Sequence, residues 1–294
     1  MSDIIAITIT GILVGCLYGL IALGLVLIFK TTQVFNLAQG EMLLMGTWVT
    51  WSFIEFVHLP FWLAIILALI FSALLGIVIE RFALRPMLGQ SLMSMIMITI
   101  GIYSLLRGIS LYFWGGPQQT FPQVFPSQGI SVFGAPISAH LIIAAIIAVI
   151  LVIFTYAYFQ YTRGGLAMRA TAENPMIAQS IGVNVTGAFS RSWALSSMVA
   201  TMGGVLLGTA MGLSFGLSDI GLKSFPVVML GGFESIPGVL IAGPIMGLCE
   251  FLGAQFLDPL VGGGIGEIIP FVVMLIVLLI KPYGLFGYKI IERV

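Results

Sequence analysis

The chain alternates between long apolar runs and short polar turns. Eight of these runs are read as transmembrane helices, because a helix needs roughly 20 apolar residues to cross a bilayer. They lie near residues 4–29, 40–57, 60–80, 91–113, 139–160, 191–214, 237–256 and 266–280. The pattern predicts an all-α polytopic membrane protein with about eight transmembrane helices.

The composition strengthens this prediction. Hydrophobic residues make up 60% of the 294 residues and charged residues only 7%, whereas roughly 25% of an average soluble domain is charged. The apolar runs account for most of the chain, so we expect a single transmembrane domain over 1–294. The 11 basic and 11 acidic residues cancel, and without a basic cluster we expect no nucleic-acid partner.

Basic residues predict how the helices are oriented. The loop at 115–138 contains no Lys or Arg, whereas basic residues flank the run ends near 81–85, 163–191 and 281–293. By the positive-inside rule the first loop lies outside and the other regions are cytoplasmic. Three predicted helices precede the cytoplasmic loop near 81–85, so the N-terminus lies outside. Lys289 and Arg293 place the C-terminus in the cytoplasm.

Eight crossings would bring the C-terminus back to the side of the N-terminus. Termini on opposite sides of the membrane therefore require a ninth crossing. The segment near 222–233 (LKSFPVVMLGGF) is the available candidate, although it is too short for an ordinary span. Irregular backbone persists at membrane depth only where protein or a water-filled cavity satisfies it. Pro226, Gly231 and Gly232 therefore predict a short or broken helix that is buried against protein.

Two apolar runs carry glycines at four-residue spacing, which places small residues on one helix face. The glycines are Gly11, Gly15 and Gly19 in the first run, and Gly204, Gly208, Gly212 and Gly216 in the sixth. Such spacing lets a neighbouring backbone approach closely. We expect tight packing within the chain, with a subunit interface as the alternative.

A polar segment, FNLAQGE at 35–41, stands directly before the second run and after Lys30, on the predicted cytoplasmic side. Asn36 can cap the following helix, and Glu41 suits the positive end of its dipole. A cap does not explain Gln39 or Gly40. The lining of a substrate path by Asn36, Gln39 and Glu41 therefore stays open beside the capping interpretation.

Three further charged residues lie in or beside apolar runs. Glu250 is inside the run at 237–256, where a carboxylate is costly and usually faces a cavity or a partner; a path role and a structural hydrogen bond both stay open. Arg107 is about two turns from the outer end of its run, within snorkelling reach of the interface. Glu80 stands at the inner end of the third run, where we expect it to face headgroups or pair locally.

The sequence shows no enzyme signature. It has no HExxH, no GxSxG and no GxxxxGK[ST] phosphate loop. His58 and His140 lie at outer run ends, where water or headgroups explain them. We therefore expect no catalytic residue, no metal site and no cofactor bound by this chain.

The predicted cytoplasmic loop at 161–190 is ordered rather than merely polar. Asn174 followed by Pro175 is a helix-start signal, and Gly182 suits the position after the end of a short helix, MIAQSI. A simple loop between spans needs no such helix. The segment fits a surface presented to a soluble partner, and an ordinary loop stays the alternative on physical grounds.

The stretch RATAENPMIAQSIGVN resembles the EAA-type coupling loop of permeases in ATP-binding cassette importers, in the version of the LivH-type branched-chain amino acid transporters. Four more stretches are similar to that family and occur in its order. They are VFNLAQGEMLLMG, IERFALRP, LGGFESIPGVLIAG and KPYGLFG. Together the five cover nearly the whole chain.

The resemblance implies an inner-membrane permease subunit without its own ATPase. Its partners would be a second, LivM-like permease, two cytoplasmic ATPase subunits that use ATP, and a periplasmic binding protein. The positions carried over as ATPase-coupling residues are Ala172, Glu173, Asn174, Ala178 and Gly182. The implied substrate is a branched-chain or other amino acid, with urea, amides and aromatic acids as alternatives.

The rival class is a secondary transporter or channel that is driven by an ion gradient alone. Such coupling usually needs a buried carboxylate near the membrane midplane. Glu250 is the best candidate for it and Glu41 the second. The ordered loop at 161–190 has no evident use in such a protein.

Overall fold

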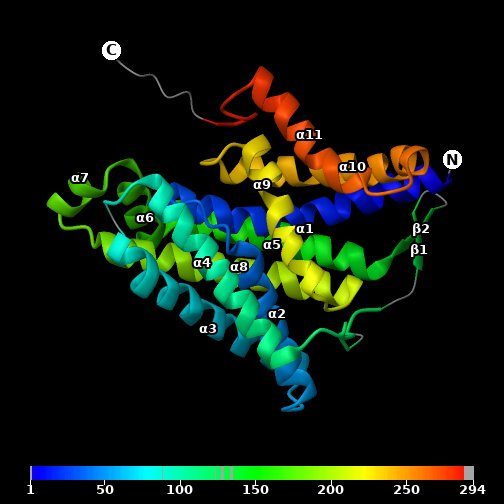
Figure 1. The fold of residues 1–294 in the computed structure, drawn as a ribbon, viewed down its shortest axis with the longest axis horizontal. Coiled ribbons are helices and arrows are strands. Elements are labelled where there is room, and N and C mark those ends of the chain that lie inside the picture. Colours follow the sequence, from blue (N-terminus) through cyan, green and yellow to red (C-terminus); the bar gives the residue numbers. More distant parts are fainter. Residues whose placement is uncertain (1, 88, 123, 127–128, 133–134, 288–294) are drawn as a thin grey trace.

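Long helices dominate the computed structural model, as the hydrophobic pattern predicts (Figure 1). The structure describes residues 2–87, 89–122, 124–126, 129–132 and 135–287. Lys289 and Arg293, which entered the orientation argument, lie outside these ranges. The helices are α1 (Ser2–Thr32), α2 (Gln39–Glu55), α3 (Phe61–Ile79), α4 (Leu92–Trp114), α5 (Ala139–Tyr161), α6 (Arg163–Glu173), α7 (Pro175–Ser180), α8 (Val185–Met211), α9 (Asp219–Gly231), α10 (Ile236–Val261) and α11 (Ile265–Ile280), with short turns of helix at η1 (Glu80–Leu84), η2 (Arg85–Met87) and η3 (Phe215–Ser218).

Six helices in the described part of the chain are long and apolar enough to cross a membrane. They are α1, α3 with its continuation through η2, α4, α5, α8 and α10. The runs predicted near 40–57 and 266–280 form α2 and α11, which have only 17 and 16 residues. At 1.5 Å per residue they fall short of a hydrocarbon core about 30 Å thick. The expectation of about eight full spans is therefore not confirmed, because two of the eight are shorter helices.

The short helix expected near 222–233 is α9, which has 13 residues and holds Pro226 inside it. Gly232 follows its end with φ +98, a left-handed conformation that glycine adopts without steric cost. The side chains of Val227 and Leu230 are buried, and α9 packs against α1, α10 and α11. The prediction of a short helix buried against protein is confirmed.

The central helix is α1, which runs along the long axis of the molecule (Figure 1). Every one of its residues from Leu17 to Ile28 is buried. Gly11, Gly15 and Gly19 all face α10. A Cβ atom on Gly15 would lie 2.7 Å from the Cα atom of Pro244. The two backbones therefore touch, and a side chain there would push them apart.

The α8 glycines have more varied surroundings. Gly204 lies against Thr47 and Leu43 of α2, and Gly208 lies against Thr47 and Phe121. Gly212 differs, because it follows the last residue of α8 with φ +86. It ends the helix rather than forming a packing groove, and the spacing alone could not distinguish these two uses.

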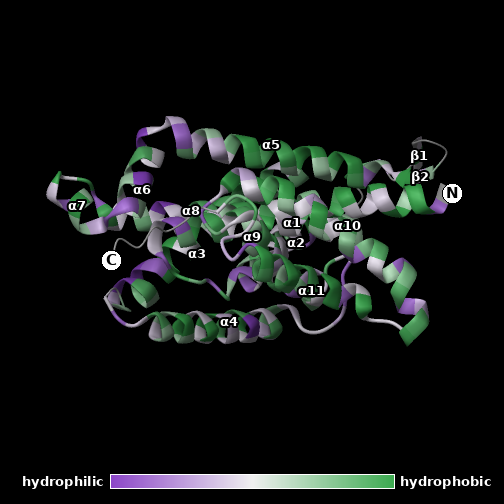
Figure 2. Cartoon of the chain, turned by 90° about the horizontal axis from the view of Figure 1, so that it is seen from above, coloured by the Kyte–Doolittle hydropathy of each residue, from purple (hydrophilic) through white to green (hydrophobic). Residues whose placement is uncertain are grey.

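A small hairpin interrupts the all-helical pattern that the sequence predicts. Strands β1 (Gly129–Val132) and β2 (Ala135–Ser138) pair antiparallel, with Ile130 opposite Ile137. The hairpin and the N-terminus lie at one end of the long axis, and α6 and α7 lie at the other (Figure 1). Hydrophilic residues gather at the α6 and α7 end (Figure 2).

The regions that carry the predicted inner charges meet at this hydrophilic end. Lys30 Nζ donates a hydrogen bond to the Glu234 carbonyl oxygen at 2.9 Å. Arg85 pairs with Glu80 at 2.9 Å and also reaches Ser190 Oγ of α8 at 3.1 Å. Glu80 thus pairs locally, which was one of its two expected roles. These charged regions lie at one end of the molecule, as regions on the same side of the membrane should. That this side is the cytoplasm stays a prediction.

Candidate functional site

The polar segment at 35–41 is largely buried inside the helical bundle. The side chain of Gln39 rests against Gly24 of α1, eight residues before α1 ends at Thr32, which corresponds to about 12 Å along the helix. Asn36, Gln39 and Glu41 are each at most 1% exposed. Helix α2 therefore begins within the bundle, and the side of the membrane to which this segment is closer stays a prediction.

Asn36 is not the N-cap of α2, although the sequence predicts that role. The helix begins at Gln39, with Ala38 at the cap position and no side-chain cap. Asn36 Oδ1 instead accepts a hydrogen bond from the Ala38 N–H at 3.1 Å, and its amide donates to Gln39 Oε1 at 3.0 Å. Ser196 Oγ of α8 donates to the same Gln39 oxygen at 3.1 Å.

Glu41 is completely buried and forms an ion pair with Arg107 of α4 at 3.2 Å. The same Arg107 nitrogen donates to Ser218 Oγ at 2.7 Å and to the Phe215 carbonyl oxygen at 3.1 Å. Its guanidinium also lies 5.0 Å from the centre of the Phe215 ring. Arg107 thus turns inward, which corrects the expectation that it snorkels to the interface; a buried carboxylate needs a cation and hydrogen bonds to be tolerated.

Gly40 allows the starts of α2 and α9 to meet backbone to backbone. A Cβ atom on Gly40 would collide with the Ser218 carbonyl oxygen, and one on Gly221 would collide with the Gly40 backbone. This contact explains the glycine that capping left unexplained. It joins residues that are far apart in the sequence, so no local pattern could have predicted it.

Glu250 belongs to a second buried ion pair, with Lys223 of α9 at 2.6 Å. The structure therefore divides the four path candidates: Asn36 and Gln39 are hydrogen-bonded to each other, whereas Glu41 and Glu250 lie in two separate ion-pair clusters. Both clusters involve α9 or the turn just before it. Lys223 was missed in the sequence, although a lysine in a short apolar segment was a usable signal for a partner of Glu250.

The segment that the resemblance assigns to coupling forms two helices, α6 and α7. Asn174 caps α7, because its Oδ1 accepts hydrogen bonds from the Met176 and Ile177 N–H groups at 2.9 and 3.1 Å. Gly182 follows the helix with φ +86, as its predicted position requires. Ala178 is the buried residue of α7, which packs against α6 and α8. Helix α6 was not predicted, because its apolar positions are sparse.

Helix α7 exposes large apolar side chains at the hydrophilic end of the molecule. Met176 is 80% exposed, Ile177 62% and Ile181 72%. Ala172 and Glu173, at the end of α6, instead face a cavity beside α1. The five coupling candidates thus divide into three groups: Asn174 and Gly182 at the ends of α7, Ala178 on its buried side, and Ala172 and Glu173 in the wall of a cavity.

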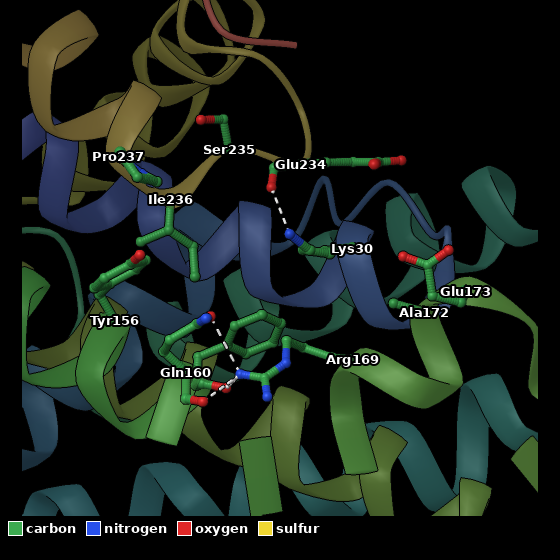
Figure 3. Close-up of a pocket in the computed structure, with 11 residues that line it drawn as sticks. Lys30, Tyr156, Gln160, Arg169, Ala172, Glu173, Glu234, Ser235, Ile236 and Pro237 are labelled. Carbon is green, nitrogen blue, oxygen red and sulfur yellow. Dashed lines mark hydrogen bonds between the residues drawn. The ribbon is translucent and has the colours of Figure 1, made fainter. Parts of the chain in front are cut away.

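This cavity has a volume of about 840 Å³ and lies between the ends of α1 and α5, helix α6 and the first turn of α10 (Figure 3). Arg169 Nη1 donates to the Phe159 carbonyl oxygen at 2.6 Å and so caps the end of α5. At the wall of the cavity, Lys30 Nζ donates a hydrogen bond to the Glu234 carbonyl oxygen at 2.9 Å. The cavity is lined by Lys30, Tyr156, Phe159, Gln160, Arg169, Ala172, Glu173, Glu234, Ser235, Ile236 and Pro237.

Comparison with known proteins identifies the family. Residues 7–278 match the model of the branched-chain amino acid transport system permease component. The permease LivH of Salmonella typhimurium is 28% identical over 97% of this chain and 96% of its own length. The probable LivH of Methanocaldococcus jannaschii is 30% identical over 91% of this chain and 88% of its own.

More distant similarities are also found. The xylose/arabinose import permease XylH of Sulfolobus acidocaldarius is 26% identical over 56% of this chain and 44% of its own. The solved structure of PsaBC from Streptococcus pneumoniae in complex with Fab aligns with a TM-score of 0.49 and 14% identity, over 95% of this chain and 91% of that one. On the match over residues 7–278, the chain belongs to the family of permease components of branched-chain amino acid transport systems.

Proposed function

We propose that this chain is the membrane-spanning permease subunit of an ATP-binding cassette importer in the bacterial inner membrane. The observation that carries the proposal is the family match over residues 7–278. The substrate that this membership favours is a branched-chain amino acid or a similar small amino acid. A second, LivM-like permease would complete the passage, and a periplasmic binding protein would deliver the solute.

Energy would come from two separate ATPase subunits that dock on α7. The exposed Met176, Ile177 and Ile181 side chains form an apolar tip, and grouped exposed apolar side chains mark protein contacts. Asn174 and Gly182 fix the two ends of this helix, Ala178 is its buried residue, and the helix packs against α6 and α8. A force applied to the tip would therefore reach α8 directly and α1 through α6.

The solute path would run beside the short helices α2 and α9, whose starts meet at Gly40 and Gly221. Asn36, Gln39 and Glu41 supply buried polar groups there, and Gln39 Nε2 has no hydrogen-bond partner among the described residues. Broken or short helices offer such groups to solutes at membrane depth in other transporters. Glu250 would act at a second point, beside Lys223.

The gradient-driven alternative receives less support from the same residues. A carboxylate that carries a proton or a sodium ion must be able to exchange it. Glu41 and Glu250 are both held by cations, Arg107 at 3.2 Å and Lys223 at 2.6 Å. Their charges are therefore already compensated, which favours an external source of energy.

The test is the ATPase rate of the reconstituted complex. Thermal-shift screening of the binding protein against amino acids, urea and aromatic acids would first identify the solute. The loaded binding protein should then raise the ATPase rate several-fold over the unloaded protein. A rate that no loaded binding protein changes would refute the importer proposal.

A further inference from the structure

The cavity beside the coupling segment has features of a ligand site in its own right. It is separate from the buried groups at the start of α2, and no role proposed so far uses it as a whole. We propose that it binds a small zwitterionic ligand, a free amino acid, and that the bound ligand restrains the coupling segment.

The charges around the cavity indicate what kind of ligand fits. Lys30 and Arg169 supply two positive groups, and Glu173 and Glu234 supply two negative ones. The ion pairs within the described part of the chain involve other residues, so none of these four is neutralised by a neighbour within 4.0 Å there. A simple anion or cation would satisfy only one pair of charges. A ligand with both a carboxylate and an ammonium group satisfies both.

The placement of the charges suits a short ligand. The Lys30 side chain lies between Glu234 and Glu173, and the Arg169 guanidinium lies at the end of α5, where its Nη1 is hydrogen-bonded (Figure 3). The Phe159 ring, 5.3 Å from Lys30 Nζ and 6.0 Å from Arg169 Cζ, orients both cations, since aromatic faces attract cations at such distances.

The remaining wall also favours an amino acid. The first turn of α10, from Ser235 to Pro237, lines the cavity, and the positive end of a helix dipole attracts a carboxylate. Ile236 and Tyr156 offer apolar surface for a ligand side chain. The volume of about 840 Å³ lies in the range of small-molecule sites, about 300–1,000 Å³.

Occupancy of this cavity would oppose movement of the coupling segment. Glu173 is the last residue of α6 and directly precedes Asn174, which caps α7. A ligand held by Glu173 and Lys30 ties this junction to α1, and contact with Glu234 ties it to the turn before α10. The binding argument stands on the cavity alone, whereas the restraint of an ATPase-coupled movement rests on the proposed function.

The binding test uses the full chain in nanodiscs of phosphatidylcholine and phosphatidylglycerol, with titration calorimetry. The probes are leucine, 4-methylpentanoate, which lacks the ammonium group, and 3-methylbutylamine, which lacks the carboxylate. Leucine should bind at least about tenfold more tightly than either analogue, because a charged hydrogen-bonded contact is worth about that factor or more.

Two variants locate the binding in this cavity. Lys30→Gln and Glu173→Gln should each lower the leucine affinity about tenfold. Glu173→Gln should leave the affinity for 4-methylpentanoate unchanged, because that probe has no ammonium group. Arg163→Gln is the matched control, since Arg163 lies on the same helix, is exposed and is not part of the cavity wall. A melting temperature within about two degrees of the wild type would verify folding.

Phosphatidylethanolamine headgroups carry the same two charges, so nanodiscs containing this lipid provide a second arm. The affinity for leucine should not change when phosphatidylethanolamine replaces phosphatidylcholine. A progressive loss of leucine binding would assign the site to the lipid and overturn the amino-acid proposal. Absence of leucine binding, or equal binding by both variants and the wild type, would also overturn it.

The restraint is tested in the complex. Leucine added on the side of the ATPases should slow ATP hydrolysis in the wild type and not in Lys30→Gln. An equal effect in both would overturn the restraint. A complex that transports no amino acid while its permease still binds leucine through Lys30 and Glu173 would refute the proposed function and leave the binding site standing.

Discussion

At the scale of single residues, the contact between Glu41 and Arg107 is the most consequential. Both lie in apolar helices, and Glu41 is fully buried. The guanidinium is shared between the Glu41 carboxylate, the Ser218 hydroxyl and the Phe215 carbonyl oxygen. One side chain of α4 therefore holds the start of α2 against the turn that leads into α9.

Loss of this cation should destabilise the fold. Arg107→Leu leaves Glu41 buried without its partner, and breaking a buried pair from one side costs about 3 kcal/mol or more. We expect that decrease in the free energy of unfolding, measured by denaturant titration of the purified protein in detergent. The double variant Glu41→Gln, Arg107→Leu should recover more than half of the loss. Equal stability of the single variant and the wild type would contradict this account of the pair.

The meeting of α2 and α9 at Gly40 is tested by the smallest possible side chain. Gly40→Ala places a methyl group against the Ser218 carbonyl oxygen, and overpacking of this kind costs about 1–3 kcal/mol. Gly108→Ala in α4 is the control, because a Cβ atom there meets nothing within 4 Å. It should be neutral or stabilise the helix by up to about 1 kcal/mol. The same unfolding assay gives both values, and equal effects would argue against the close backbone contact.

Sequence reasoning selected several of these residues but not their partners. Asn36, Gln39 and Glu41 stood out because polar groups are costly between apolar runs. Arg107 is 66 positions after Glu41, and its direction depends on where α2 begins. A start at Gln39 turns Glu41 towards α4, and no local signal placed that start so deep within the bundle. Distance along the chain therefore concealed the pairing.

At the scale of helices, α7 connects the described fold to its proposed partner. It is only six residues long, too short to be stable alone, since isolated helices shorter than about 12 residues are marginal in water. Its cap at Asn174, its end at Gly182 and its anchor at Ala178 compensate for this. The helix is thus held in place while its apolar side chains stay exposed.

Docking of the ATPase subunits should depend on this exposed tip. Ile177→Asp removes an apolar contact worth about 1.5–3 kcal/mol when buried, so co-purification of the ATPase with tagged permease should fall at least about tenfold. Ile130→Asp, on the hairpin at the opposite end, is the control, since Ile130 is also half exposed. Undiminished co-purification of the Ile177 variant would place the docking surface elsewhere.

The sequence pattern was most informative for helices that can be recognised from the length of an apolar run. The long apolar runs correspond to helices because hydrophobic length is a local property. Termini on opposite sides of the membrane require an odd number of crossings, and this count predicted a short helix near 222–233. Helix α9 is that helix. The depth of α2 was missed because it depends on packing against distant parts of the chain. The hairpin at β1 and β2 was missed although its two strands are neighbours in the sequence.

At the scale of the whole molecule, the two ends of the long axis differ in composition and in the elements that they hold. The hydrophilic end holds α6, α7, Lys30 and the cavity, and the other end holds the N-terminus and the hairpin (Figures 1 and 2). Short helices α2 and α9 meet between them, where the proposed path runs. The proposed energy source acts at the hydrophilic end, so coupling would have to travel along α8 and α1.

Uptake of radiolabelled leucine by proteoliposomes that contain the complete complex tests the central claim most directly. The account predicts uptake that requires both ATP on the side of α7 and the loaded binding protein on the opposite side. Imposed proton or sodium gradients should give no uptake on their own. Uptake driven by such a gradient, without ATP and without the binding protein, would contradict it.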